Sequence, residues 1–121
     1  MSIFKTPEEN LFKAVEQVNV RKVRELLASG TDPNAVNKFG LKPLDACIET
    51  LKNYVGRTGL YDEEITVIFN TKLIWDELVR KGGSLNKYKD DPQFEQGFTV
   101  KQKRFGKPGP DMVFPAPKPK H

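Results

Sequence analysis

The chain has 121 residues, of which 37% are hydrophobic and 30% charged, and its formal net charge is +4. This length suits one domain with a modest core, and the charged fraction is typical of a polar globule with much surface. No apolar run is long enough to cross a membrane and residues 1–9 lack the apolar core of a signal peptide, so we expect a cytoplasmic protein.

Residues able to support catalysis are few. His121 is the only histidine and stands at the last position, while Cys47 is the only cysteine and has no histidine to activate it. The sequence contains neither a glycine-rich phosphate loop nor a metal-binding motif. We therefore expect a non-enzyme without cofactor or metal. A lone cysteine also excludes an internal disulfide, and Cys47 is interpreted as a packed, buried thiol.

The first two helices are predicted from caps and periodicity. Thr6 followed by Pro7 is typical of a helix start, and apolar residues then recur at helical spacing. This pattern predicts a helix over residues 7–18. A second apolar face, which includes Val23 and Leu27, predicts a helix over residues 20–29 that ends before Gly30.

The stretch from Val20 to Asp45 carries the clearest motif. A leucine pair and Gly30 are followed by a polar passage, a second glycine and a proline that suits a helix start. In this order the residues resemble the junction between two ankyrin repeats. The matching positions are Leu26, Leu27, Gly30, Asp32, Asn34, Ala35, Gly40, Pro43 and Leu44. Lys42 and Asp45 replace the threonine and histidine of the family pattern, and we expect a salt bridge between them instead.

The resemblance implies a second, enlarged repeat. Helical patterns predict helices over residues 43–54 and 63–81, and the second of these ends in LVRKGGSLN, which echoes LLASGTDPN at the end of the first repeat. Gly30 and Gly82 are 52 positions apart, whereas the ankyrin period is about 33 residues, so about nineteen residues are inserted, with an unusual loop at 54–62. Trp75 is interpreted as a core anchor.

Residues 87–121 differ in composition from the rest. They contain eight basic and four acidic residues, whereas residues 1–86 are neutral overall, and six of the nine prolines lie here. Because disordered tails are poor in aromatic residues, the five aromatics predict an ordered, extended tail over the last repeat. Gly97–Phe105 and Asp111–Phe114 are expected to form a loose hairpin, with Lys107 to Pro110 between them. Phe94, Phe98 and Phe105 are expected to close the end of the stack.

Together these patterns predict an all-α fold, a short ankyrin-like stack of two antiparallel helix pairs with an extended C-terminal segment. The expected division is a helical domain over residues 1–86 and a basic extension over residues 87–121. Ankyrin-like proteins bind other proteins through their turn tips and inner helices. The resemblance therefore implies a non-catalytic module with the partner-binding residues Lys38, Phe39, Leu41, Asp45 and Glu49.

The partner and the oligomeric state stay open. The partner is expected to be a protein that the chain regulates or neutralises, as an immunity protein neutralises a toxin. The chain is expected to be a monomer or a homodimer. A rival hypothesis is single-stranded nucleic-acid binding by the tail. Lys101, Lys103, Arg104 and Lys107 interleave there with Phe98 and Phe105, a mixture of charge and stacking surface that such ligands favour.

Overall fold

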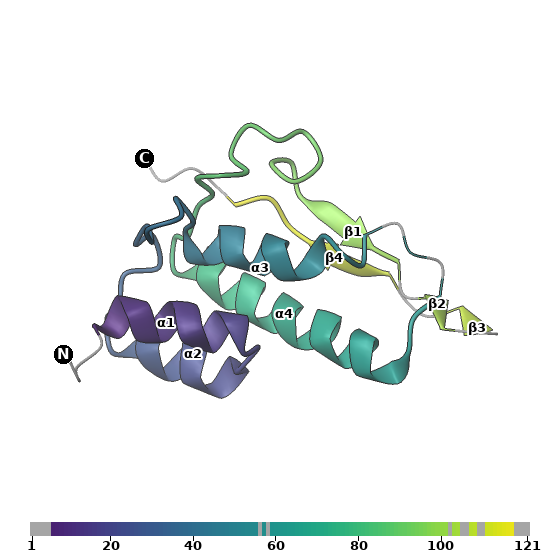
Figure 1. Ribbon diagram of the computed structural model, residues 1–121, viewed down its shortest axis with the longest axis horizontal. Helices are drawn as coiled ribbons and strands as arrows, with labels where there is room; N and C mark the ends of the chain where they lie inside the picture. Colours follow the sequence, from purple (N-terminus) through teal and green to yellow (C-terminus); the bar gives the residue numbers. More distant parts are fainter. Residues whose placement is uncertain are drawn as a thin grey trace.

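The fold comes from a computed structural model that describes residues 6–55, 57, 59–101, 103–104, 107–108 and 111–117. Its main elements are four helices: α1 (Pro7–Glu16), α2 (Val20–Ala28), α3 (Pro43–Leu51) and α4 (Asp62–Arg80). α1 packs on α2 and α3, and α4 packs on α3 and α2 (Figure 1). The chain is therefore mostly helical, as predicted, with the four helices packed together.

The helix starts agree with the sequence and the helix ends differ by up to three residues. Thr6 accepts a hydrogen bond from the Glu9 N–H at 3.1 Å, and Asn19 accepts one from the Lys22 N–H at 3.1 Å, so α1 and α2 are both capped by side chains. α1 ends at Glu16 rather than at residue 18, because Val18 has a φ of 55° that no α-helix accommodates. α3 ends at Leu51 rather than at residue 54.

The ends of α2 and α4 share one hydrogen-bonding pattern. Gly30 donates to the Leu27 carbonyl and Thr31 donates to the Leu26 carbonyl, both at 3.1 Å. At the end of α4, Gly82 and Gly83 make the two equivalent bonds. Each is a Schellman motif closed by a glycine with positive φ, 96° at Gly30 and 87° at Gly82. The similarity of the two sequence segments therefore corresponds to the same local structure.

The segments that follow these two glycines are joined by side chains. The Asn34 side-chain amide donates to the Gly82 carbonyl at 3.0 Å, and its oxygen accepts from the Ser84 N–H at 2.8 Å. The Asn86 side chain donates to the Gly40 carbonyl at 2.7 Å. These bonds link positions more than forty residues apart. They hold the connection between α2 and α3 at Asn34 and at Gly40 to the segment that follows α4.

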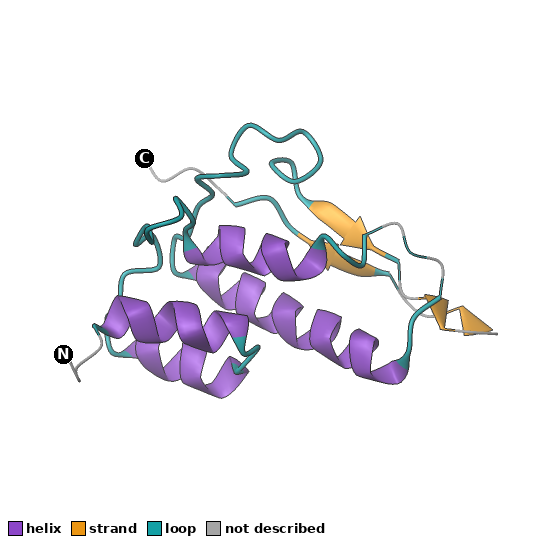
Figure 2. Cartoon of the chain, viewed as in Figure 1, coloured by secondary structure: helices purple, strands orange, loops and turns teal. Residues whose placement is uncertain are grey.

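The C-terminal segment contains short strands, which the predicted all-α fold class did not include. β1 (Phe98–Val100) pairs antiparallel with β4 (Met112–Phe114), with Phe98 opposite Phe114 and Val100 opposite Met112. β2 (Lys103–Arg104) pairs with β3 (Lys107–Pro108). The predicted hairpin is confirmed for β1 and β4. The pairing of β2 with β3 was not predicted, because Lys107 and Pro108 were expected in the connection and not in a strand. Figure 2 shows the strands on the side of α3 and α4 away from α1 and α2.

Trp75 joins this strand pair to the helices. Its side chain is fully buried in α4, and its indole N–H donates to the Pro115 carbonyl at 2.9 Å. The rings of Phe98 and Phe114 stack on each other at 4.7 Å between centroids and both meet the indole edge-on. The expectation that Trp75 is a core anchor is confirmed. Phe94 is also buried, whereas Phe105 lies outside the described residues.

The core runs without interruption from the first helix to the last strand. One cluster contains the buried apolar residues of the four helices, β1 and β4. It extends along the chain from Leu11 to Phe114. Cys47 is completely buried within this cluster, which confirms the prediction of a packed thiol. Its pKa is raised mainly by burial and secondarily by the nearby Asp45 carboxylate. In the described part of the chain, no helix has both the length and the apolar character needed to cross a membrane.

Candidate functional site: a groove beside the first turn

A tight turn at residues 37–41 projects from the helices. The Asn37 N–H donates to the Leu41 carbonyl at 2.9 Å, and the Gly40 N–H donates to the Asn37 carbonyl at 3.0 Å. The Asn37 side-chain oxygen also accepts from the N–H groups of Phe39 and Leu41. Gly40, with a φ of 77°, closes the turn in a conformation that glycine adopts without strain. Lys38 and Phe39 therefore occupy the corner of a turn whose backbone is fixed.

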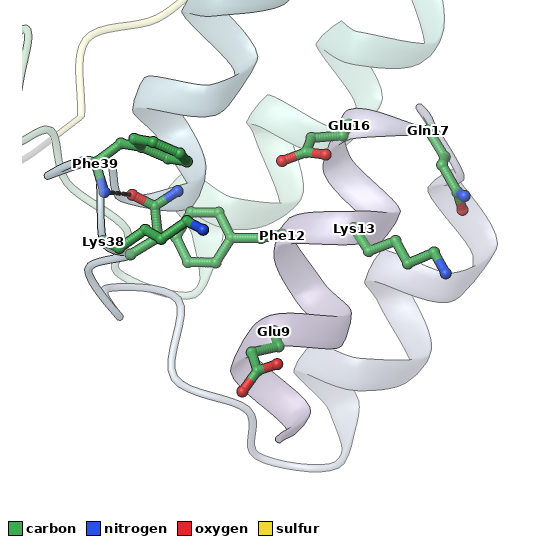
Figure 3. Close-up of a pocket in the computed structure, with 8 residues that line it drawn as sticks. Glu9, Phe12, Lys13, Glu16, Gln17, Lys38 and Phe39 are labelled. Carbon is green, nitrogen blue, oxygen red and sulfur yellow. Dashed lines mark hydrogen bonds between the residues drawn. The ribbon is translucent and has the colours of Figure 1, made fainter. Parts of the chain in front are cut away.

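A groove of about 730 Å³ lies between this turn and α1. Glu9, Phe12, Lys13, Glu16 and Gln17 line it from the helix, and Asn37, Lys38 and Phe39 line it from the turn. Figure 3 shows the Phe12 ring pointing from α1 toward the turn, with Glu9 and Glu16 on either side of it along the helix.

The two walls differ in exposure. Phe12 is only 8% exposed and forms an apolar base, whereas Phe39 is 71% exposed on the opposite wall. The Lys38 ammonium lies 5.2 Å from the centroid of the Phe39 ring. An exposed phenylalanine held by a fixed turn above an apolar base is a surface on which another molecule can bury area at little entropic cost.

Three of the five residues expected from the sequence lie on or beside this turn. Lys38 and Phe39 line the groove. Leu41 is half-buried and packs against the core, so it supports the turn rather than projecting from it. The structure does not bring Asp45 and Glu49 into the groove lining.

The expectation that Asp45 is an exposed contact residue is wrong. Its side chain is fully buried, and its carboxylate accepts three backbone hydrogen bonds, from the N–H groups of Lys42 at 2.8 Å, Asn86 at 2.9 Å and Tyr88 at 3.0 Å. The carboxylate thus caps α3 and at the same time fixes the segment that follows α4. The salt bridge expected between Lys42 and Asp45 is not formed. The Lys42 ammonium instead donates to the Ser84 hydroxyl at 2.9 Å.

Glu49 is held by contacts within the chain. It accepts a hydrogen bond from the Tyr88 hydroxyl and forms ion pairs with Lys52 at 3.1 Å and Lys87 at 3.5 Å. The Tyr88 hydrogen bond, together with the two lysines, lowers the pKa of Glu49. Burial and the Glu49 carboxylate raise the pKa of Tyr88. Glu49 therefore ties α3 to the start of the C-terminal segment.

The sequence analysis missed the contribution of α1. From the sequence, this helix was expected to contribute only the apolar residues that recur at helical spacing, which are Leu11, Ala14, Val15 and Val18. The available signal was Phe12, a large apolar residue outside that apolar stripe, with Glu9 and Glu16 at helical spacing on its two sides.

The tail offers less stacking surface than the sequence suggested. Phe98 is stacked on Phe114 and packed against Trp75, so its ring faces are engaged within the protein. Lys101 is exposed, but the side chains of Lys103, Arg104, Phe105 and Lys107 lie outside the description. Among the described residues, no cluster of histidine, cysteine, aspartate or glutamate has the arrangement of a metal site.

Comparison with protein families, with curated proteins and with solved structures gives no significant match. The geometry of the groove is therefore the basis for a proposal about function.

Proposed function

We propose that the chain is a short, ankyrin-like module that binds a protein partner through the groove between α1 and the turn at residues 37–41. The single observation that carries this proposal is the 71% exposure of Phe39 on a fixed turn facing the apolar base of the groove. Aromatic residues that become desolvated at the centre of an interface supply a large share of its binding energy.

The ankyrin-like architecture is part of the same proposal. Its support is internal: α2 and α4 end in the same glycine motif, and the segments after the two glycines are joined through Asn34 and Ser84. Two helix pairs arranged in this way leave the turn and the first inner helix on one side, which is where such repeats carry their contact residues. The inserted residues fall in the connection between α3 and α4 and in the length of α4.

We propose further that the module is non-catalytic and acts as a regulatory or neutralising partner. The groups whose pKa is clearly shifted include Cys47, Glu49 and Tyr88, and each is explained by burial or by a contact that joins elements of the fold. Perturbed groups at an active site would be expected to face a cleft instead. Tight association requires only the shape and the anchors of the groove.

The test is affinity capture with quantitative comparison of two variants. Phe39→Ala removes the anchor on the groove, and the control Phe69→Ala removes an exposed phenylalanine on α4, away from the groove. The proposal predicts a protein that is retained by the parent and by Phe69→Ala and is lost with Phe39→Ala, since a truncated anchor costs about 2 kcal/mol or more. Equal retention by both variants would contradict it, as would retention of nuclease-sensitive nucleic acid alone.

A further inference from the structure

The helical wall of the groove carries two carboxylates in a defined geometry. Glu9 and Glu16 are seven residues apart on α1, which is about two helical turns, so they lie on the same face and their Cα atoms are about 10.5 Å apart along the axis. Phe12 lies between them, and Figure 3 shows all three side chains on the side of α1 that faces the turn. The wall is therefore an aromatic base flanked by two acidic groups.

Both carboxylates are available to a ligand. Glu16 is exposed, and none of the ion pairs found among the described residues includes it or Glu9. Glu9 is also exposed, and it accepts one hydrogen bond from the neutral Thr6 hydroxyl at 3.3 Å. Lys13 also lines the groove, but in Figure 3 its side chain extends away from the turn.

We infer that the groove binds an extended, proline-containing segment of the partner that carries two basic residues three positions apart with apolar residues between them. This inference rests on the proposed function and gives the chemistry of its ligand. In the polyproline II conformation, residues i and i+3 lie on the same side and about 9.3 Å apart, which matches the spacing of Glu9 and Glu16 within the reach of lysine or arginine side chains.

The aromatic residues fit the part of the ligand between its two basic residues. Proline-rich segments bind in grooves lined by aromatic side chains, because their backbone is already ordered and loses little entropy on binding. Phe12 forms the base and Phe39 the opposite wall of such a groove. A helical ligand with basic residues at i and i+7 would have the same spacing of about 10.5 Å, so the choice of an extended ligand rests on the aromatic lining of the groove and not on the spacing of the charges.

Lys38 provides a second, oppositely directed test. Its ammonium lies over the Phe39 ring at 5.2 Å and therefore repels a basic ligand and competes with it for the aromatic face. Lys38→Met should strengthen binding of a basic ligand. Lys81→Met is the matched control, because it removes the same charge from an exposed position beyond the end of α4.

The experiment is fluorescence anisotropy with a fluorescein-labelled synthetic peptide that contains Lys-Pro-Leu-Lys between glycine-serine flanks. We expect the double variant Glu9→Gln/Glu16→Gln to weaken its binding about tenfold, corresponding to the loss of two charge pairs. The double variant Glu63→Gln/Asp90→Asn, which changes the net charge equally at exposed sites elsewhere, should change binding less than about twofold. A peptide with one residue between the lysines should bind more weakly.

Two results would overturn the inference: no saturable binding of the Lys-Pro-Leu-Lys peptide, or equal weakening by the two double variants. These outcomes are separate from a failure of the proposed function. If Phe39→Ala abolishes capture of a protein partner while Glu9→Gln/Glu16→Gln leaves capture and peptide binding unchanged, the module stands and the ligand chemistry is wrong. If Phe39→Ala leaves capture unchanged, the proposed function itself fails.

Discussion

Asp45 joins two parts of the chain that lie more than forty residues apart. Its buried carboxylate accepts backbone hydrogen bonds from the start of α3 and from the segment that follows α4, at Asn86 and Tyr88. A buried N–H that loses its acceptor retains its desolvation cost, which is about 1–3 kcal/mol per group. The contribution of this residue is therefore to the arrangement of the two helix pairs rather than to a partner.

Asp45→Ala should lower the free energy of unfolding by about 3 kcal/mol or more, because three donors lose their acceptor at once. Urea denaturation followed by circular dichroism measures this change. Asp32→Ala is the control, since Asp32 is exposed and accepts one local hydrogen bond, from the Asn34 N–H at 2.8 Å. Its expected cost is less than about 1 kcal/mol. Similar costs for the two variants would show that the buried network does not stabilise the fold.

Glu49 gives a prediction for acid pH. Its pKa is lowered from 4.5 in the folded state, first by the Tyr88 hydroxyl and then by Lys52 and Lys87. A lowered pKa means that the carboxylate stabilises the fold above pH 4.5, and that this stabilisation is lost as the pH falls through the folded-state value. The difference in stability between the parent and Glu49→Gln should therefore shrink as the pH falls from about 6 toward 3.

The measurement is urea denaturation of the parent, Glu49→Gln and Tyr88→Phe across this pH range. Tyr88→Phe removes the strongest cause of the lowered pKa, so the carboxyl titration of Glu49, followed by carbon NMR, should move toward its ordinary value. A parent-to-variant difference that stays constant with pH would contradict the assignment.

At the scale of elements, the strand pair β1–β4 covers Trp75 on α4. Its inward residues alternate with exposed ones: Phe114 is fully buried, whereas its neighbour Val113 is 55% exposed. The pair is therefore a half-buried antiparallel ribbon, which needs a partner surface for its stability.

Phe114→Ala should cost about 3–5 kcal/mol, since it removes a buried ring that stacks on Phe98 and meets Trp75 edge-on. Val113→Ala, one position away on the outward face, should change stability by less than about 0.5 kcal/mol. Thermal unfolding of the two variants gives the comparison. Equal melting temperatures would mean that the C-terminal segment does not stabilise the helices.

The elements that the sequence predicted well are those specified by local chemistry. Thr6 and Pro7 mark the start of α1, and Gly30 marks the end of α2, because caps and left-handed glycines act within one turn of the chain. The end of α3 was placed three residues too late. The apolar pattern continues through Tyr54 and Val55, which are half-buried against the core but are not helical. The apolar pattern predicted their burial, but it did not show that the helix had already ended.

The candidate site was predicted less completely because it depends on contacts between distant segments. Lys38 and Phe39 were expected because the ankyrin resemblance places them on the turn, and the turn itself is specified by local residues. The role of Asp45 was missed, since its partners Asn86 and Tyr88 follow α4 and no short-range pattern brings them near α3. The opposite wall was missed because nothing in the sequence of α1 alone shows which of its faces lies beside the turn.

In the described part of the molecule, the packed helices and strands form a base from which Phe39 projects. A continuous core extends from α1 to β4, and side-chain hydrogen bonds from Asn34 and Asn86 fix the turn from behind. Such a base allows association with little reordering of the free protein, which favours specificity and a slow dissociation rate. We propose that another protein binds at the groove beside Phe39.

The most direct measurement is site-specific photocrosslinking inside the cells that make the protein. Benzoylphenylalanine replaces Phe39 in one variant and Phe69 in the other, so that exposed aromatic positions on the groove and on α4 are compared. If a protein binds at the groove, a discrete protein adduct should form from position 39 and should be absent at position 69. The same adducts from both positions, or an adduct from position 69 alone, would contradict it.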